Sequence, residues 1–291
     1  MAVRRFILLG LVLLFLALPS KGQISELLQK CDEAYAQNFI KEKLKEAIEC
    51  YEKALELDAN NKHALNRLSQ AYYEWAFAFL FIFAEDRAKT RDEQRAAYLK
   101  GKDFGLRSLR LDPEFKANEE GKGLIEAIKL AKDVVAVFWF GNNAGKALEF
   151  ERDPLKQLNE VNTVKAAFER AVALDEGYFA GAPLRSLGTM LANLPFFLGG
   201  DLEKAKALLE RAVAKFPEYL ENHVLFAREY LVRAAKGKSP DEIKQLRDQF
   251  EKMLNFVLKA PEGDKFILWN RVAKKEAEEL LAKIDELFPK G

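Results

Sequence analysis

Apolar and polar residues alternate along this chain with the period of an α-helix, and one short pattern returns at the ends of predicted helices. A small residue is followed four positions later by a larger apolar residue and three positions after that by another small residue, so all three share one helix face. Copies lie at 44–58, 164–175 and 202–217, with a weaker one at 101–113. The pattern is typical of helices that pack against antiparallel neighbours. Its recurrence predicts a repeat array, whose usual role is binding rather than catalysis.

Hydrophobic periodicity predicts about eleven helices and no convincing strand, which makes the expected fold all-α. The predicted helices span 24–39, 42–57, 62–86, 91–111, 117–147, 157–174, 180–198, 201–216, 219–236, 240–258 and 266–287. Local signals support two of the starts. Asp201 is a candidate N-cap, and Ser239-Pro240-Asp241-Glu242 has the form of a capping box with proline at the first helical position.

Residues 58–72 resemble the tetratricopeptide repeat, in which a leucine, a small residue and an aromatic residue pack the first helix, here Leu68, Ser69 and Tyr72. That repeat recurs about every 34 residues. The equivalent small residues here are 54, 63 and 41 positions apart: Ala54, Ser108, Ala171 and Ala212. The units must therefore contain extra turns or helices. We predict an irregular, cryptic tetratricopeptide-repeat array that forms a single helical domain over residues 23–291.

The N-terminus has the features of a secretory signal. Arg4 and Arg5 precede an apolar run over 6–18, and small residues occupy the −3 and −1 positions of a cleavage site after Gly22. We predict a signal peptide at residues 1–22 and a soluble, exported mature chain; an uncleaved N-terminal anchor is the alternative. No cysteine stands at the cleavage point, so no lipid anchor is expected.

Charge and cysteine content narrow the functional classes further. The formal net charge is +1 and no basic block stands out, which argues against a nucleic-acid partner. Cys31 and Cys50 are the only cysteines. They form either a disulfide between two antiparallel helices or two partly buried free thiols, and their spacing does not decide between these. His63 and His223 are far apart in sequence, and neither they nor the cysteines indicate a metal site.

One unusual segment is the best candidate for lining a ligand cavity. Between 134 and 146, aromatic residues are followed at once by glycines, amides and a lysine, and an asparagine inside a helix must find a partner or face a polar cavity. The candidate lining residues are Phe138, Trp139, Phe140, Asn142, Asn143 and Lys146. Close helix packing around the glycines is the alternative. A second aromatic stretch, 72–83, is expected to be a central core helix.

Two other clusters are candidates for a partner surface or groove. Phe196 and Phe197 precede a double-glycine turn and Asp201, and they form either an exposed patch or a hydrophobic staple onto the next helix. The second cluster is Trp269-Asn270-Arg271, expected near the start of the last helix.

The sequence contains no pattern of a known catalytic site. It lacks a nucleophile elbow, a zinc-protease helix, a phosphate loop and a dinucleotide-binding turn. We therefore expect a protein that is not an enzyme and that needs no cofactor or metal.

Taken in order, three blocks resemble the T component of TRAP transporters, the tetratricopeptide-repeat proteins of tripartite ATP-independent periplasmic transporters. The blocks are Phe138–Asn143, Phe196–Asp201 and the C-terminal stretch Trp269–Phe288. The resemblance covers essentially the whole mature chain. It implies a periplasmic, all-helical protein that forms homo-oligomers, with a trimer as the first candidate. It also implies docking of a solute-binding P component and passage of ligand through an internal channel. Some relatives are lipid-anchored, which this chain is not equipped to be.

Two functional hypotheses follow from the sequence. In the first, the protein is a transport accessory subunit that docks a solute receptor and offers a cavity for a small, partly hydrophobic ligand. In the second, it is a generic tetratricopeptide scaffold for protein–protein interaction in the cell envelope. A cavity that reaches Asn142 and Asn143 would favour the first. The transported solute and the number of subunits stay open, because core and interface contacts use the same residue types.

Overall fold

The computed structural model describes residues 21–289, and this part of the chain is helical without any β-strand, so the predicted all-α fold is confirmed. The first half contains α1 (Lys21–Tyr35), α2 (Lys41–Leu57), α3 (Lys62–Glu74), η1 (Trp75–Ile82), α4 (Arg91–Leu109), α5 (Pro113–Lys122), α6 (Leu124–Leu130) and α7 (Val134–Leu148). The second half contains α8 (Pro154–Asp175), α9 (Tyr178–Asn193), η2 (Phe196–Leu198), α10 (Leu202–Lys215), α11 (Leu220–Leu225), η3 (Phe226–Leu231), α12 (Val232–Ala234), α13 (Pro240–Lys259), α14 (Ile267–Ala282) and α15 (Ile284–Leu287). The predicted signal peptide, 1–22, lies outside the described residues except for Lys21 and Gly22, which begin α1.

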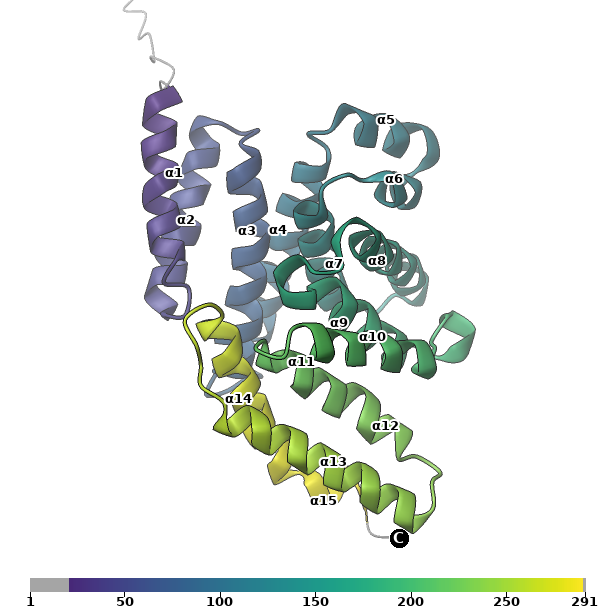
Figure 1. Ribbon diagram of the computed structural model, residues 1–291. Helices are drawn as coiled ribbons and strands as arrows, with labels where there is room; N and C mark the ends of the chain where they lie inside the picture. The colour runs from purple at the N-terminus through teal and green to yellow at the C-terminus, as the bar shows by residue number, and fades with distance from the viewer. Residues whose placement is uncertain (1–20, 290–291) are drawn as a thin grey trace, which may run out of the picture.

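Neighbouring helices in the chain pack side by side, and the C-terminal part returns to the N-terminal part. Contacts join α1 to α2, α2 to α3 and α3 to α4; α7 then lies between α4 and α8, and α9 between α8 and α10. Near the C-terminus, α14 packs against α11 and α13 and also against η1. Figure 1 shows α14, in yellow, below the lower ends of α1–α3. This return brings the loop before α14 close to the first three helices.

The small residues of the recurring sequence pattern are buried where helices meet. This holds for all four of them, Ala54, Ser108, Ala171 and Ala212. A small side chain lets the backbone of a neighbouring helix come close, so the pattern reports helix packing. The derivation of these helix pairs from tetratricopeptide repeats stays a prediction.

The predicted single helix over 117–147 is wrong, because the chain breaks there twice. Gly123, with a φ of 86°, ends α5 and precedes α6. A short extended segment follows α6, and Asp133 then caps α7 by accepting a hydrogen bond from the Ala136 backbone N–H. The apolar residues on both sides of these breaks keep a helical period, which hides the breaks in the sequence.

Other predicted helices also change geometry along their length; the one expected over 219–236 contains a π-helix, η3. The helix expected over 62–86 becomes a π-helix, η1, at Trp75 and ends at Ile82. The span expected over 180–198 begins with a left-handed turn: Phe179, Ala180 and Gly181 have φ values of 45°, 54° and 80°. That helix ends at Asn193, and the short η2 follows Pro195.

The largest group of buried apolar side chains surrounds α7 and includes Phe138, Trp139 and Phe140. It continues into η1 and α14. Between residues 21 and 289, no helix combines the length and the apolar character needed to cross a bilayer. Of the aromatic residues in 72–83, Phe77 belongs to this core and Tyr73, Phe79 and Phe81 pack against it, whereas Phe83 is exposed.

Candidate functional site

A cavity of about 450 Å³ lies among α7, α8, α9 and the α11–η3 segment, and we call it the α7–α11 cavity. Four of the candidate residues on α7 line it: Phe138, Trp139, Asn142 and Lys146. Three of these, at 138, 142 and 146, are spaced by four residues, which places them on one face of the helix. The cavity therefore reaches Asn142 but not Asn143, and it combines aromatic, amide and cationic groups.

The other two candidates on α7, Phe140 and Asn143, are not among the lining residues. Both are buried on the side of α7 that faces α3 and α4. The Asn143 side-chain amide donates hydrogen bonds of 2.8 Å to the backbone carbonyls of Ser69 and Trp139. Because α7 is apolar on all sides, the sequence alone did not show which face borders the cavity.

Charged residues that the sequence analysis did not select form the opposite wall of the α7–α11 cavity. Arg228 pairs with Glu229 at 2.6 Å and also with Glu276. Burial raises the pKa of Glu229, but Arg228, Asn193 and Arg233 together outweigh burial, so the net shift is downward. Burial raises the pKa of Glu221 to about 7, although Arg185 opposes this. The cavity thus has an apolar wall and a wall of paired charges.

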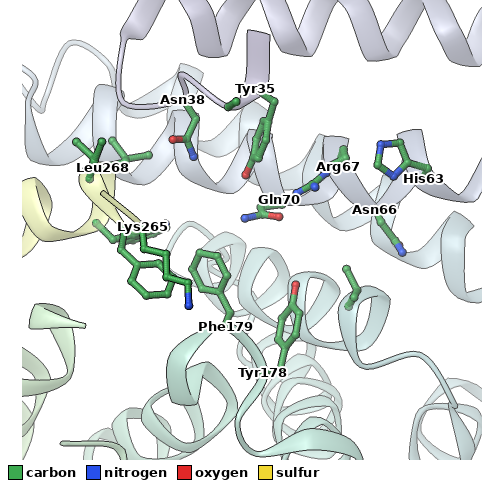
Figure 2. A pocket seen from close by; sticks show the side chains of 15 residues that line it. Tyr35, Asn38, His63, Asn66, Arg67, Gln70, Tyr178, Phe179, Lys265 and Leu268 are labelled. Atoms are coloured by element: carbon green, nitrogen blue, oxygen red, sulfur yellow. The ribbon is translucent and has the colours of Figure 1, made fainter. Parts of the chain in front are cut away.

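A second cavity, of about 510 Å³, lies among α1, α3, α9 and the segment that leads into α14, and we call it the α3–α9 cavity (Figure 2). Its polar lining comes mainly from α1 and α3, and its aromatic lining from α9 and residues 266–269. The sequence predicted neither this cavity nor most of its residues, because the lining comes from distant segments, between Tyr35 and Trp269, that only the folded chain brings together.

Two carboxylates lie behind the wall of the α3–α9 cavity and are held by other side chains. Asp32 accepts hydrogen bonds from the Tyr51 hydroxyl and from His63 Nε2, the latter at 2.8 Å. Glu74 accepts a 2.8 Å hydrogen bond from the Tyr35 hydroxyl and is also held by Asn38 and Gln70. Burial raises the pKa of Glu74 despite these donors.

The left-handed turn at the start of α9 positions Phe179 in the wall of this cavity. Non-glycine residues rarely adopt positive φ, so the turn needs support. Arg185 Nη1 donates to the carbonyl oxygens of Phe179 and Ala180, at 3.1 and 3.0 Å, and its guanidinium lies 4.0 Å from the Tyr219 ring centre. The neighbouring Tyr178 hydroxyl accepts a 2.8 Å hydrogen bond from the Trp139 indole. This bond links the walls of the two cavities.

Trp269 lines both cavities and stacks on Tyr73 and Phe77. The other members of its cluster line neither. The Asn270 side-chain oxygen accepts a 3.0 Å hydrogen bond from the Leu220 N–H, which fixes the start of α11. Arg271 pairs with Glu262 at 2.8 Å near the surface. Of this cluster, the structure brings Trp269 alone to a cavity.

Phe196 and Phe197 form an exposed pair, with relative residue accessibilities of 92% and 83%. The staple alternative is therefore wrong, because a staple would bury these rings. Asp201 accepts from the Lys204 N–H and caps α10, as predicted. A Cβ atom at Gly200 would lie 1.8 Å from the Leu194 carbonyl oxygen, so the tight turn between them requires glycine.

Cys31 and Cys50 form a disulfide that joins α1 to α2. Among residues 21–289, no group of three or more His, Cys, Asp or Glu side chains is placed to hold a metal ion.

Comparison with known protein families gives one match that covers most of the chain. Residues 35–288 match the family model described as TRAP transporter T-component. The matched range includes both cavities and the exposed phenylalanine pair. No curated protein matches the chain at a significant level.

Proposed function

The chain belongs to the T-component family of TRAP transporters, and we propose that it acts in the periplasm as a non-enzymatic accessory subunit. In this proposal it docks the solute-binding P component and passes a small, partly hydrophobic ligand. Membership of the family supports an accessory role in transport. Docking of the P component and passage of the ligand are the steps that we add to this role.

The observation that carries the proposal is the α7–α11 cavity. Its volume of about 450 Å³ is in the range of small-molecule sites. Phe138 and Trp139 supply apolar surface, while Asn142 and Lys146 supply polar contacts within the same wall. A site with this lining suits a ligand that has both an apolar body and a polar group.

The exposed phenylalanine pair is the proposed docking element for the P component. Asn193 and Leu194 line the α7–α11 cavity and precede Phe196 by only a few residues, so the pair lies close to this cavity in the chain. Exposed aromatic side chains are frequent anchors of protein interfaces because they bury a large area with few rotatable bonds. A receptor bound there would lie beside the cavity.

Two further features fit an exported protein. The predicted signal peptide would direct the chain out of the cytoplasm. The Cys31–Cys50 disulfide is of the kind that persists in oxidising compartments. Homo-oligomerisation, with a trimer as the first candidate, is part of the proposal, and sedimentation velocity of the mature chain tests it.

Docking is tested with the solute-binding protein encoded beside the TRAP membrane subunits. The mature chain is immobilised and receptor binding is measured by biolayer interferometry. Changing both Phe196 and Phe197 to serine should weaken binding by about tenfold or more, as expected for interface anchors. Leu99→Ser on α4 is the control, because Leu99 is also exposed but lies on another helix. If the double variant binds the receptor with unchanged affinity, the exposed phenylalanine pair is not the docking element. No binding by the wild-type chain would refute docking and favour the generic scaffold.

A further inference from the structure

Apart from two tyrosines, the ionisable side chains that line the α3–α9 cavity are all basic or imidazole groups. Arg67 and His63 come from α3, and Lys265 comes from the segment before α14. No aspartate or glutamate is among the lining residues. The α7–α11 cavity differs, because its lining pairs cations with Glu149, Glu221 and Glu229. The charge of the α3–α9 lining thus favours an anion.

Arg67 has hydrogen-bond donors that the protein itself does not use. Its guanidinium lies 4.8 Å from the Tyr35 ring centre, and its Nε is 3.8 Å from Asp32 Oδ1, beyond hydrogen-bond distance. It forms no hydrogen bond with another residue of the described range 21–289. Asp32 is already bound by Tyr51 and His63. A guanidinium carries five N–H donors in a planar fork that matches a carboxylate, so Arg67 is equipped to bind one.

Two more donors face the same space. The Tyr178 hydroxyl oxygen accepts from Trp139, which leaves its hydrogen free to donate to another acceptor. Lys265 is exposed, and no hydrogen bond or ion pair joins it to another residue between 21 and 289. Figure 2 shows the polar ends of Arg67 and Tyr178 directed into the space between them, with Lys265 farther away, beside Phe179.

The rest of the lining is apolar and aromatic. Phe179 and Phe266 meet edge to face with ring centres 5.8 Å apart, and Leu268 and Trp269 continue this surface. A bare inorganic anion would leave these groups without contacts. A ligand with an apolar body would cover them and exclude water from its anionic end, which strengthens the interaction with Arg67.

Two carboxylates near the cavity act on Arg67: Asp32 forms a long ion pair with it at 3.8 Å, and both Asp32 and Glu74 raise its pKa. Asp32 and Glu74 are bound by hydroxyl, imidazole and amide donors, and neither lines the cavity. Asp133, near the same end of α7, pairs with Lys62 at 2.7 Å. Within residues 21–289, Arg67 therefore has an ion pair but no hydrogen bond, and Lys265 has neither.

We propose that the α3–α9 cavity is a binding site for an organic monocarboxylate with an aromatic or branched apolar body. The carboxylate binds Arg67 and the Tyr178 hydroxyl, Lys265 attracts it at the entrance, and Phe179, Phe266 and Trp269 contact the body. This site is separate from the α7–α11 cavity, and its occupancy does not require receptor docking. The two proposals can therefore fail independently.

The test is isothermal titration calorimetry on the purified mature chain without any receptor. The probe is 4-phenylbutyrate. Two comparison compounds each lack one feature: 4-phenylbutan-1-ol has the body without the charge, and succinate has carboxylates without the body. The variants are Arg67→Gln and Lys265→Gln.

Arg107→Gln is the matched control for Arg67. Both arginine side chains are 38% exposed, both lie over an aromatic ring, and each has a carboxylate oxygen 3.8 Å away. Arg107 lines none of the cavities described above. A difference in affinity for 4-phenylbutyrate between the two variants is therefore due to the position of Arg67 in the cavity and not to the loss of a surface cation.

The expected result is that 4-phenylbutyrate binds and that Arg67→Gln weakens this binding by about tenfold or more, since a charge-assisted hydrogen bond is lost. Lys265→Gln should weaken it by about threefold, and Arg107→Gln should change it by less than about twofold, because long-range attraction at an exposed site is screened. Both comparison compounds should bind at least about tenfold more weakly than the probe.

Several results would overturn the proposal. These are no binding of 4-phenylbutyrate by the folded wild-type chain, equal binding of the alcohol or of succinate, or wild-type affinity in Arg67→Gln. Circular dichroism establishes that each variant is folded. If Arg67→Gln does not fold, the exposed and unpaired Lys265 provides the deciding variant, and wild-type affinity in Lys265→Gln then counts against the site.

Discussion

The side-chain amide of Asn143 on α7 occupies the space that any side chain at Gly101 on α4 would need. A Cβ atom at Gly101 would lie 2.3 Å from Asn143 Oδ1. One turn further along α4, a Cβ atom at Gly105 would lie 3.0 Å from the Phe140 Cα atom. These two glycines let α4 and α7 approach closely, and the approach turns Phe140 and Asn143 away from the α7–α11 cavity.

Gly101→Ala should destabilise the protein by about 1–3 kcal/mol, the usual cost of overpacking a buried contact. Asn143 cannot move aside cheaply, because its amide would lose its hydrogen bonds to the Ser69 and Trp139 carbonyls. Urea unfolding followed by circular dichroism measures the change.

Gly121→Ala is the control for this prediction. Gly121 is also helical, but nothing lies within 4 Å of a Cβ atom built there. Alanine at that position should leave the free energy of unfolding unchanged or raise it by about 0.5–1 kcal/mol. If both variants change the free energy of unfolding by the same amount, the contact between position 101 and Asn143 does not contribute to stability.

Glu221 should make stability fall as the pH rises toward neutrality. Burial raises the pKa of its carboxyl from 4.5 to about 7 in the folded protein. Between these values the folded state holds the proton more often than the unfolded chain, so the stabilisation is complete below about pH 4.5 and is lost by about pH 7, with a total of up to about 3 kcal/mol. Glu221→Gln should flatten this part of the curve of unfolding free energy against pH.

His223 acts in the opposite direction in part of the same range. Burial lowers its pKa below 6.5, so protonation as the pH falls destabilises the folded state. The difference between wild type and Glu221→Gln removes this shared contribution. Glu218→Gln, at an exposed position in the same segment, should retain the wild-type profile. Parallel profiles for the wild type and Glu221→Gln would contradict the assignment.

Reduction of the Cys31–Cys50 disulfide should destabilise the protein by about 3 kcal/mol, because the cross-link restricts the unfolded chain between cysteines 19 positions apart. The measurement is urea unfolding with and without dithiothreitol. The double variant with alanine at both positions should be insensitive to the reductant. An unchanged midpoint, with thiol titration showing complete reduction, would mean that helix packing alone holds α1 against α2.

Local signals in the sequence were sufficient to predict the fold class and the first residues of several helices. The all-α fold followed from the helical period, and Asp201 and the Ser239–Glu242 capping box begin helices as predicted. Such caps depend on residues within one turn of each other, so a single short stretch contains the whole interaction. The recurring small residues were also informative, since all four are buried between helices.

Other features depended on contacts between distant segments. The left-handed turn at Phe179 is supported by Arg185 and Asn222, and Asn222 belongs to another helix. The face of α7 that borders a cavity depends on the glycines of α4. Periodicity could not separate the cavity side of this helix from its packed side, so the sequence selected Phe138 and Asn142, which line the cavity, together with Phe140 and Asn143, which do not.

The sequence by itself determined the helical class, the caps, the small residues at helix contacts and the aromatic segment on α7. Each of these features depends on residues that are only a few positions apart in the chain. The tertiary structure decided which side chains meet in a cavity. Arg67, Tyr178 and Lys265 lie in three segments that become neighbours when the chain returns to its first helices. Their shared space depends on the path of the backbone, which no local pattern encodes.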